Sequence, residues 1–108
     1  MSLSTHVLDA TSGRPAIGVR VALRSTDGAT VLATALTDAD GRVASFAVDD
    51  VDAGRYQLVF DTGTYFAERS VATFYPEVVV SFEITDASAH HHVPLLLSPF
   101  AYSTYRGS

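Results

Sequence analysis

Short segments of alternating apolar and polar residues, divided by turn-forming residues, recur along this chain. The clearest segment covers residues 77–85, in which every second residue from Val78 to Ile84 is apolar. Because successive side chains of a β-strand point to opposite faces, this pattern predicts a strand with one buried face. Seven or eight such segments predict an all-β fold, in which two sheets pack face to face as a β-sandwich.

The other strands follow from the same alternation and from the turns between them. We expect Asp27-Gly28 and Asp40-Gly41 to form hairpin turns, because these residue types tolerate a positive φ angle. An acidic loop is expected at 49–54, a first strand contains His6, and Pro99 precedes the last strand. The remaining strands are expected at residues 19–24, 30–36, 42–48, 56–60, 90–97 and 101–105.

One segment departs from the alternating pattern. Within residues 61–70, Thr62 or Thr64 could cap a helix of about two turns that runs through Tyr65 to Glu68. We therefore expect one short helix as the exception in an otherwise all-β chain.

The composition limits both the size of the fold and the chemistry open to it. The 108 residues are enough for one domain, 1–108, with a single two-layer core. The absence of cysteine excludes disulfides and thiolate zinc sites. All seven basic residues are arginine, which excludes a lysine Schiff base and favours planar, oxygen-rich ligands.

Charge and hydropathy restrict the partners of the chain. A net charge of −5 argues against nucleic acid and anionic membranes as partners. No apolar run approaches the roughly 18 residues of a membrane span. The first residues, Met1 to His6, lack the charged and apolar regions of a signal peptide. We therefore expect a cytoplasmic protein.

The C-terminal stretch is unusual, because apolar and aromatic residues continue almost to its end. Leu95, Leu96 and Leu97 are apolar on both faces of the expected strand, which indicates that a neighbouring subunit or a loop covers the second face. Beyond them, the ending Tyr105-Arg106-Gly107-Ser108 places an arginine close to the terminal carboxylate. We expect this tail to be docked, with an anionic partner or ligand at Arg106.

Three consecutive histidines precede this stretch. On a strand, His90 and His92 share one face and His91 points to the other. His90 and His92 could be a solvated strand start, a pair poised for proton transfer, or two ligands of a metal site completed by His6. By itself His6 is typical of a surface histidine, and Arg42 of an arginine that flanks a hairpin. The residues alone leave these alternatives open.

Both ends of the chain carry long motifs that resemble those of a known family. Residues 4–16 (STHVLDATSGRPA), residues 90–99 (HHHVPLLLSP) and the closing Tyr105-Arg106-Gly107-Ser108 resemble the 5-hydroxyisourate hydrolases, the transthyretin-related enzymes of urate breakdown. The closing tetrapeptide is the mark of the hydrolase branch and separates it from transthyretin, the hormone carrier of the same fold. The resemblance covers essentially the whole chain and includes residues 37–42, 60–66 and 74–78.

The resemblance implies a transthyretin-like two-sheet β-sandwich that assembles into a homotetramer, with active sites in a central channel. It implies that the substrate is 5-hydroxyisourate, which is opened at an acyl C–N bond to give 2-oxo-4-hydroxy-4-carboxy-5-ureidoimidazoline. No cofactor and no metal are expected, since cationic arginine can stabilise the developing negative charge. The alternative is a transthyretin-like carrier of small ligands without catalysis.

The resemblance also implies the residues of the site. The catalytic residues carried over by position are His6, Arg42, His92 and Ser108, and those that bind substrate are His6, Arg42, Tyr105 and Arg106. His6 and His92 are the candidates for the base that deprotonates water, whereas Tyr105 and Ser108 could hold a water or the substrate. One position departs from the family, which usually has tyrosine where this chain has His91. Since His91 should point away from His92, we expect the chemistry to survive this change.

Overall fold

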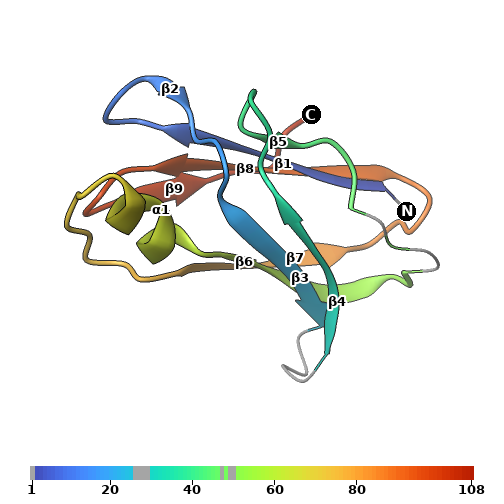
Figure 1. Ribbon diagram of the computed structural model, residues 1–108. Coiled ribbons are helices and arrows are strands. Elements are labelled where there is room, and N and C mark those ends of the chain that lie inside the picture. The colour runs from blue at the N-terminus through green and yellow to red at the C-terminus, as the bar shows by residue number, and fades with distance from the viewer. Residues whose placement is uncertain (1, 26–29, 47, 49–50) are drawn as a thin grey trace.

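The chain forms two β-sheets that pack face to face, with one short helix at an end of the sandwich (Figure 1). The structure is a computed structural model, and it describes residues 2–25, 30–46, 48 and 51–108. The predicted β-sandwich with one helix is confirmed. The described residues form nine strands rather than seven or eight, because β2 (Arg14–Pro15) is a strand of two residues that was not predicted.

The first sheet has the strand order β2-β1-β8-β9, and β5 (Arg42–Val43) also pairs with β1. Its longer strands are β1 (Ser2–Asp9), β8 (His90–Leu97) and β9 (Tyr102–Thr104). β1 and β8 run parallel along their whole length, whereas the other pairs of this sheet are antiparallel. Strands from the two ends of the chain therefore lie side by side at the centre of this sheet.

The second sheet has the order β4-β3-β6-β7, and all its pairs are antiparallel. Its strands are β3 (Arg20–Ser25), β4 (Val31–Leu36), β6 (Gly54–Phe60) and β7 (Val78–Ile84). These four strands confirm the alternation of the sequence. The turn predicted at Asp27-Gly28 lies outside the described residues.

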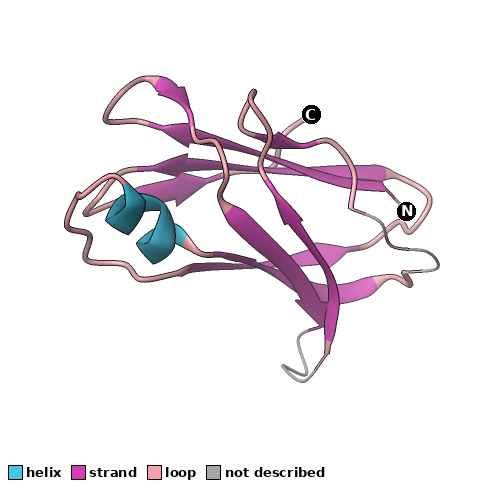
Figure 2. Cartoon of the chain, viewed as in Figure 1, coloured by secondary structure: helices cyan, strands magenta, loops and turns pink. Residues whose placement is uncertain are grey.

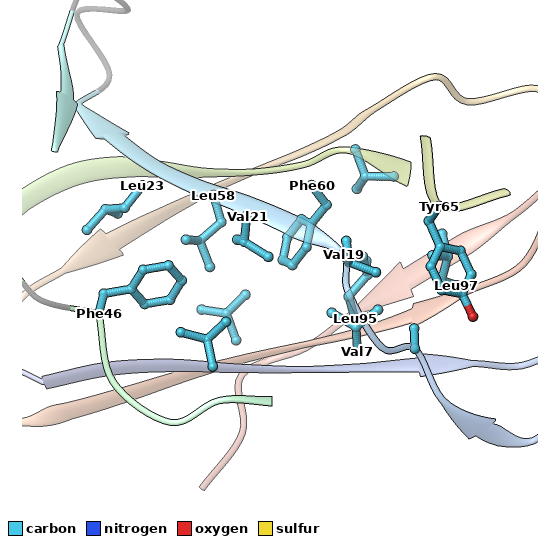
Figure 3. Packing of buried hydrophobic residues seen from close by; sticks show 14 of the residues in the cluster. Val7, Val19, Val21, Leu23, Phe46, Leu58, Phe60, Tyr65, Leu95 and Leu97 are labelled. Atoms are coloured by element: carbon cyan, nitrogen blue, oxygen red, sulfur yellow. The ribbon is translucent and has the colours of Figure 1, made fainter. Parts of the chain in front are cut away.

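The core fills the space between the two sheets (Figure 3). Every second residue of the long strands points into it, as the alternation requires. Complete burial of one valine, leucine or phenylalanine side chain stabilises a fold by about 1.5–3 kcal/mol. The fully buried residues include Val7, Leu95 and Leu97 from the first sheet and Val21, Leu23, Leu58 and Phe60 from the second.

The hairpin predicted at Asp40-Gly41 is wrong, as is the strand predicted at 42–48. The turn carries the chain from one sheet to the other, because β4 pairs with β3 and β5 pairs with β1. Gly41 has a φ angle of 74°, and its carbonyl accepts the N–H of Val7 at 2.7 Å. β5 then covers only Arg42–Val43, since the chain turns inward to bury Phe46 in the core.

The helix α1 (Thr62–Glu68) is confirmed, although neither threonine caps it. The cap is Asp61, whose carboxylate accepts the backbone N–H of Thr64 at 3.2 Å and its hydroxyl at 2.8 Å. Figure 2 shows the helix at one end of the sandwich. There the Tyr65 hydroxyl donates to Asp9 at 2.9 Å, and burial together with this carboxylate raises the pKa of Tyr65 to about 12. The helix is thereby tied to the end of β1.

Candidate active site

The outer face of the first sheet carries a row of polar side chains from β1 and β8. Along β1 the core residues alternate, so that Ser4 and His6 lie on the outer face. Along β8 the same alternation places His90 and His92 on that face. His91 points the other way, as predicted, and its side chain is buried. The parallel register sets Ser4 opposite His92, which brings the two ends of the chain into one cluster.

Arg42 joins this cluster through β5. In the antiparallel pair of β5 and β1, Arg42 lies directly opposite His6. Directly opposed residues of such a pair have Cβ atoms about 4.5–5.5 Å apart and share a face of the sheet. Arg42 is therefore placed by a tertiary strand pair, and it does not flank a hairpin as the sequence alone suggested.

Asp38 holds the loop that delivers Arg42. Its carboxylate accepts the backbone N–H of Arg42 at 3.0 Å and that of Asp40 at 2.9 Å. These two hydrogen bonds, assisted by the positive charges of Arg42 and His6, hold the pKa of Asp38 below its usual value. Sequence reasoning did not single out Asp38; the available signal was a turn-forming aspartate shortly before a glycine.

The C-terminal tail is docked by its backbone on His92. β9 pairs Thr104 with Leu95, and three residues further along each segment Gly107 pairs with His92 in the same register. The N–H of Gly107 donates to the carbonyl of His92 at 2.9 Å. A methyl group on Gly107 would overlap the His92 ring. The predicted docking of the tail is confirmed, although the side chains of Tyr105 and Arg106 and the terminal Ser108 are exposed.

Arg106 lines one cavity together with two other predicted site residues, His92 and Tyr105. This cavity has a volume of about 280 Å³ and also touches Phe82 and Glu83 of β7. Within the described part of the chain Arg106 forms no ion pair, and Glu83 pairs with Arg55 at 3.8 Å. The structure thus groups His6, Arg42, His92 and Gly107, and Arg106 lies beside His92 in the cavity that extends to β7.

A chain of hydrogen bonds connects β1 and β8 beside His92. The Ser4 hydroxyl lies 2.7 Å from Nδ1 of His92 and 3.0 Å from Nε2 of His90. Nδ1 of His90 in turn lies 2.6 Å from the Ser2 hydroxyl. Sequence reasoning missed both serines, because nothing local to residues 2–4 shows that the histidine strand lies alongside.

The surroundings of His92 favour its neutral form. Partial burial lowers the pKa of His92, and the electrostatic effects of Arg42, His90 and His6 lower it further. A neutral imidazole has one nitrogen free to accept a proton. Because Nδ1 of His92 is engaged by Ser4, the nitrogen left for a substrate or water is Nε2.

The residues described contain no group of three or more histidine, cysteine or acidic side chains arranged to hold a metal ion. His6, His90 and His92 are all among those residues, so their geometry does not support the metal alternative. What the cluster can do is accept a proton at an imidazole beside a guanidinium that binds oxygen anions.

Comparison with known proteins identifies relatives that match nearly the whole length of this chain. The model of the HIUase/Transthyretin family matches residues 3–107. A protein of Salmonella dublin called 5-hydroxyisourate hydrolase is 47% identical over 98% of this chain and 80% of its own length.

Two solved structures share the fold. The 5-hydroxyisourate hydrolase of Klebsiella pneumoniae is 41% identical, with a TM-score of 0.91 and complete coverage of both chains. The transthyretin of sea bream, solved with thyroxine, is 32% identical, with a TM-score of 0.85 over 97% of this chain and 93% of its own. Both a hydrolase and a protein solved with bound thyroxine thus have this architecture, and function has to be argued from the site.

Proposed function

This chain belongs to the HIUase/Transthyretin family, and from that premise we propose that it hydrolyses 5-hydroxyisourate. The observation that carries the proposal is the convergence of His6, Arg42 and His92 on one face of the first sheet, next to the docked Gly107. A carrier of small ligands has no need of a neutral imidazole beside a guanidinium, whereas hydrolysis requires both a base and a site for negative charge.

The reaction opens the six-membered ring of the substrate at an acyl C–N bond. Water loses a proton as it attacks the carbonyl carbon, the carbonyl oxygen becomes an anion, and the leaving nitrogen gains a proton. The product is 2-oxo-4-hydroxy-4-carboxy-5-ureidoimidazoline. A positioned base and a preorganised anion site are therefore the two contributions that the protein must make.

His92 is the proposed base. Its lowered pKa keeps the ring neutral near neutral pH, and its bond to Ser4 leaves Nε2 free to take the proton of water. His6, opposite Pro94 on the neighbouring strand, is placed to orient the water or the substrate. A positioned base of this kind contributes about 10²–10⁴-fold to the rate.

Arg42 is the proposed donor to the developing oxyanion. Its guanidinium offers planar N–H groups, which suit the carbonyl oxygens of a flat heterocycle. The exposed Tyr105 and Ser108 are proposed to hold substrate or water through their hydroxyls and the terminal carboxylate. Arg106 is proposed as a further substrate contact, reached from the β7 side of the tail.

We further propose that the active enzyme is a homotetramer whose sites open into a channel between subunits. The outer face around His6 and His92 is then enclosed by a second subunit, which would exclude water from the reacting atoms. Within the described residues no helix is long and apolar enough to cross a membrane. A cytoplasmic location is part of the same proposal.

The proposal is tested by following the ultraviolet decay of 5-hydroxyisourate, made in place by urate oxidase, with and without the protein. Because the substrate also decays spontaneously, the quantity to measure is the rate above background. We expect acceleration proportional to protein concentration. Saturable binding without acceleration would instead support the carrier, and sedimentation of the same sample reports whether it is a tetramer.

A further inference from the structure

We infer that Ser4 and His90, together with Ser2, form a hydrogen-bonded relay that selects the tautomer of His92 and exchanges its proton with solvent. The inference deepens the proposed hydrolysis and rests on it. It adds His90, which lies outside the predicted catalytic set, as a positioning residue that acts through His92.

The parallel pairing of β1 and β8 builds the relay. Ser2 lies opposite His90 and Ser4 opposite His92, so the serines and histidines of the outer face alternate along the strand pair. The Ser4 hydroxyl bridges the two rings, 2.7 Å from His92 and 3.0 Å from His90. The rings themselves are stacked with centroids 6.5 Å apart, too far for a direct hydrogen bond between them.

The Ser4 hydroxyl has a single proton and can donate to only one of the two rings. This gives the chain of hydrogen bonds a direction. If the hydroxyl donates to Nε2 of His90, it can only accept from Nδ1 of His92, which must then carry a proton. His92 is thereby held with Nε2 unprotonated, which is the form that a base needs. Nδ1 of His90 correspondingly donates to Ser2 at 2.6 Å. The hydrogen bond at one ring nitrogen sets the state of the other.

The proton transfer is balanced within the chain. Once Nε2 of His92 has taken a proton from water, the Nδ1 proton passes to the Ser4 oxygen while the hydroxyl proton of Ser4 passes to Nε2 of His90. One N–H and one O–H bond break, one of each forms, and the positive charge moves from His92 to His90. His90 can then release its Nδ1 proton to solvent. To restore the first arrangement, His90 takes a proton from solvent at Nδ1 and returns its Nε2 proton through Ser4 to Nδ1 of His92, and His92 gives its Nε2 proton to the leaving nitrogen.

Burial and charge favour this direction. Ser4 is buried at 7% exposure and His92 is half-buried, whereas His90 is exposed and can exchange protons with water. The charged and titratable groups around His92 are His6 from β1, Arg42 from β5 and His90 from its own strand, together with Tyr105 and Arg106 of the tail and Glu83 of β7 in the adjoining cavity. Arg42 opposes a positive charge on His92.

The test compares His90→Gln and Ser4→Ala with the unaltered protein in dilute and concentrated imidazole buffer. A glutamine at 90 can still accept a hydrogen bond from Ser4 but cannot carry a proton. We expect kcat of His90→Gln to fall about tenfold in dilute buffer, with KM within about twofold, and to recover as imidazole increases. The unaltered protein should not respond to imidazole. Ser98→Ala is the control, because that hydroxyl donates to Ala101 in a turn away from the histidines.

Two results would overturn the relay: an unchanged kcat for His90→Gln in every buffer, or a reduced kcat that imidazole does not restore. A reduced kcat that imidazole does not restore points to a merely structural role of His90.

The tautomer of His92, read from the nitrogen chemical shifts of the ring, is an independent measurement. We expect a proton on Nδ1, with a shift towards Nε2–H in Ser4→Ala; an unchanged tautomer contradicts the relay. If the unaltered protein does not accelerate decay at all, the proposed function fails, and the tautomer still decides whether the chain of hydrogen bonds exists.

Discussion

At the scale of single residues, neighbours that lie far apart in the sequence determine the chemistry of His92. Ser4 holds Nδ1, the Gly107 backbone binds the carbonyl, and Arg42 opposes protonation. None of these contacts is close in the sequence. The same side chain at a solvated strand start would be an ordinary histidine with a pKa near 6.5.

Replacing His92 with alanine should reduce the hydrolysis rate at least tenfold, because the substitution removes the proposed base. The fold should persist, since His92 lies on the outer face and contributes little to the core. The measurement is the substrate decay above background, with circular dichroism to verify the sheet content. The matched control is His91→Tyr, on the core side of the same strand next to the cavity, which we expect to keep its activity. Near-normal turnover in His92→Ala would remove the role assigned to this residue.

The pH dependence of kcat should reflect the lowered pKa of His92. Activity should persist below pH 6.5 and fall as the pH drops through the pKa of the folded protein, where the base becomes protonated. Arg42→Gln should move this acid limb to higher pH, because the loss of a positive charge makes protonation easier. Arg42→Lys keeps the charge and should leave the limb in place, even if both variants are slower. If the acid limb of Arg42→Gln lies at the same pH as that of the unaltered protein, the electrostatic coupling between Arg42 and His92 is contradicted.

At the scale of elements, the site depends on two short segments that pair with the strands of the first sheet, β5 and the C-terminal tail. β5 supplies Arg42 from only two residues, and the tail extends the β9 register past Pro94, which has no N–H to donate. Such short pairings are held by a few backbone hydrogen bonds each. They are therefore the parts of the site that are most sensitive to changes in the backbone.

Gly41→Ala should destabilise the protein more than Gly13→Ala. Both glycines have a positive φ angle, 74° and 72°, and such strain costs about 1–3 kcal/mol for other residues. A Cβ atom at 41 would also lie 2.5 Å from the Val7 carbonyl oxygen, whereas nothing lies within 4 Å at 13. The comparison is made by urea unfolding. Equal losses would mean that the contact between Gly41 and β1 is unimportant.

Deleting residues 106–108 should abolish hydrolysis and leave a folded β-protein. The deletion removes the Gly107 bond to His92 and the terminal groups proposed to bind substrate, but it takes no residue from the core. The matched control is Ser103→Ala, an exposed residue on the same edge of the sheet. Full activity of the shortened chain would show that the tail is only structural.

At the scale of the whole molecule, the sandwich carries His6, Arg42 and His92 on one face of the first sheet and the core on the other. Dialysis against EDTA should leave the rate unchanged, because the proposed mechanism assigns the stabilisation of negative charge to arginine. The control is the same dialysis without chelator. Loss of activity that zinc or another divalent ion restores would revive a metal site at the histidines.

Much of this architecture could be predicted from the sequence for a physical reason. The alternation of side chains along a strand has a period of two residues and is readable locally, so β3, β4, β6, β7, β8 and β9 were found near their observed bounds. Turn chemistry was less decisive. Asp40-Gly41 has the residues of a hairpin, but the chain at this point crosses to the other sheet.

Local patterns and motifs of the chain were enough to predict the sandwich, the single helix, the shared face of His90 and His92, and the resemblance to a hydrolase family. The tertiary structure alone decided which strands are neighbours. It placed β1 parallel to β8, set Arg42 opposite His6, linked Ser4 to both histidines and directed Arg106 towards β7. Pairing between strands distant in the chain is chosen by the packing of the whole core, which no local pattern of residues encodes.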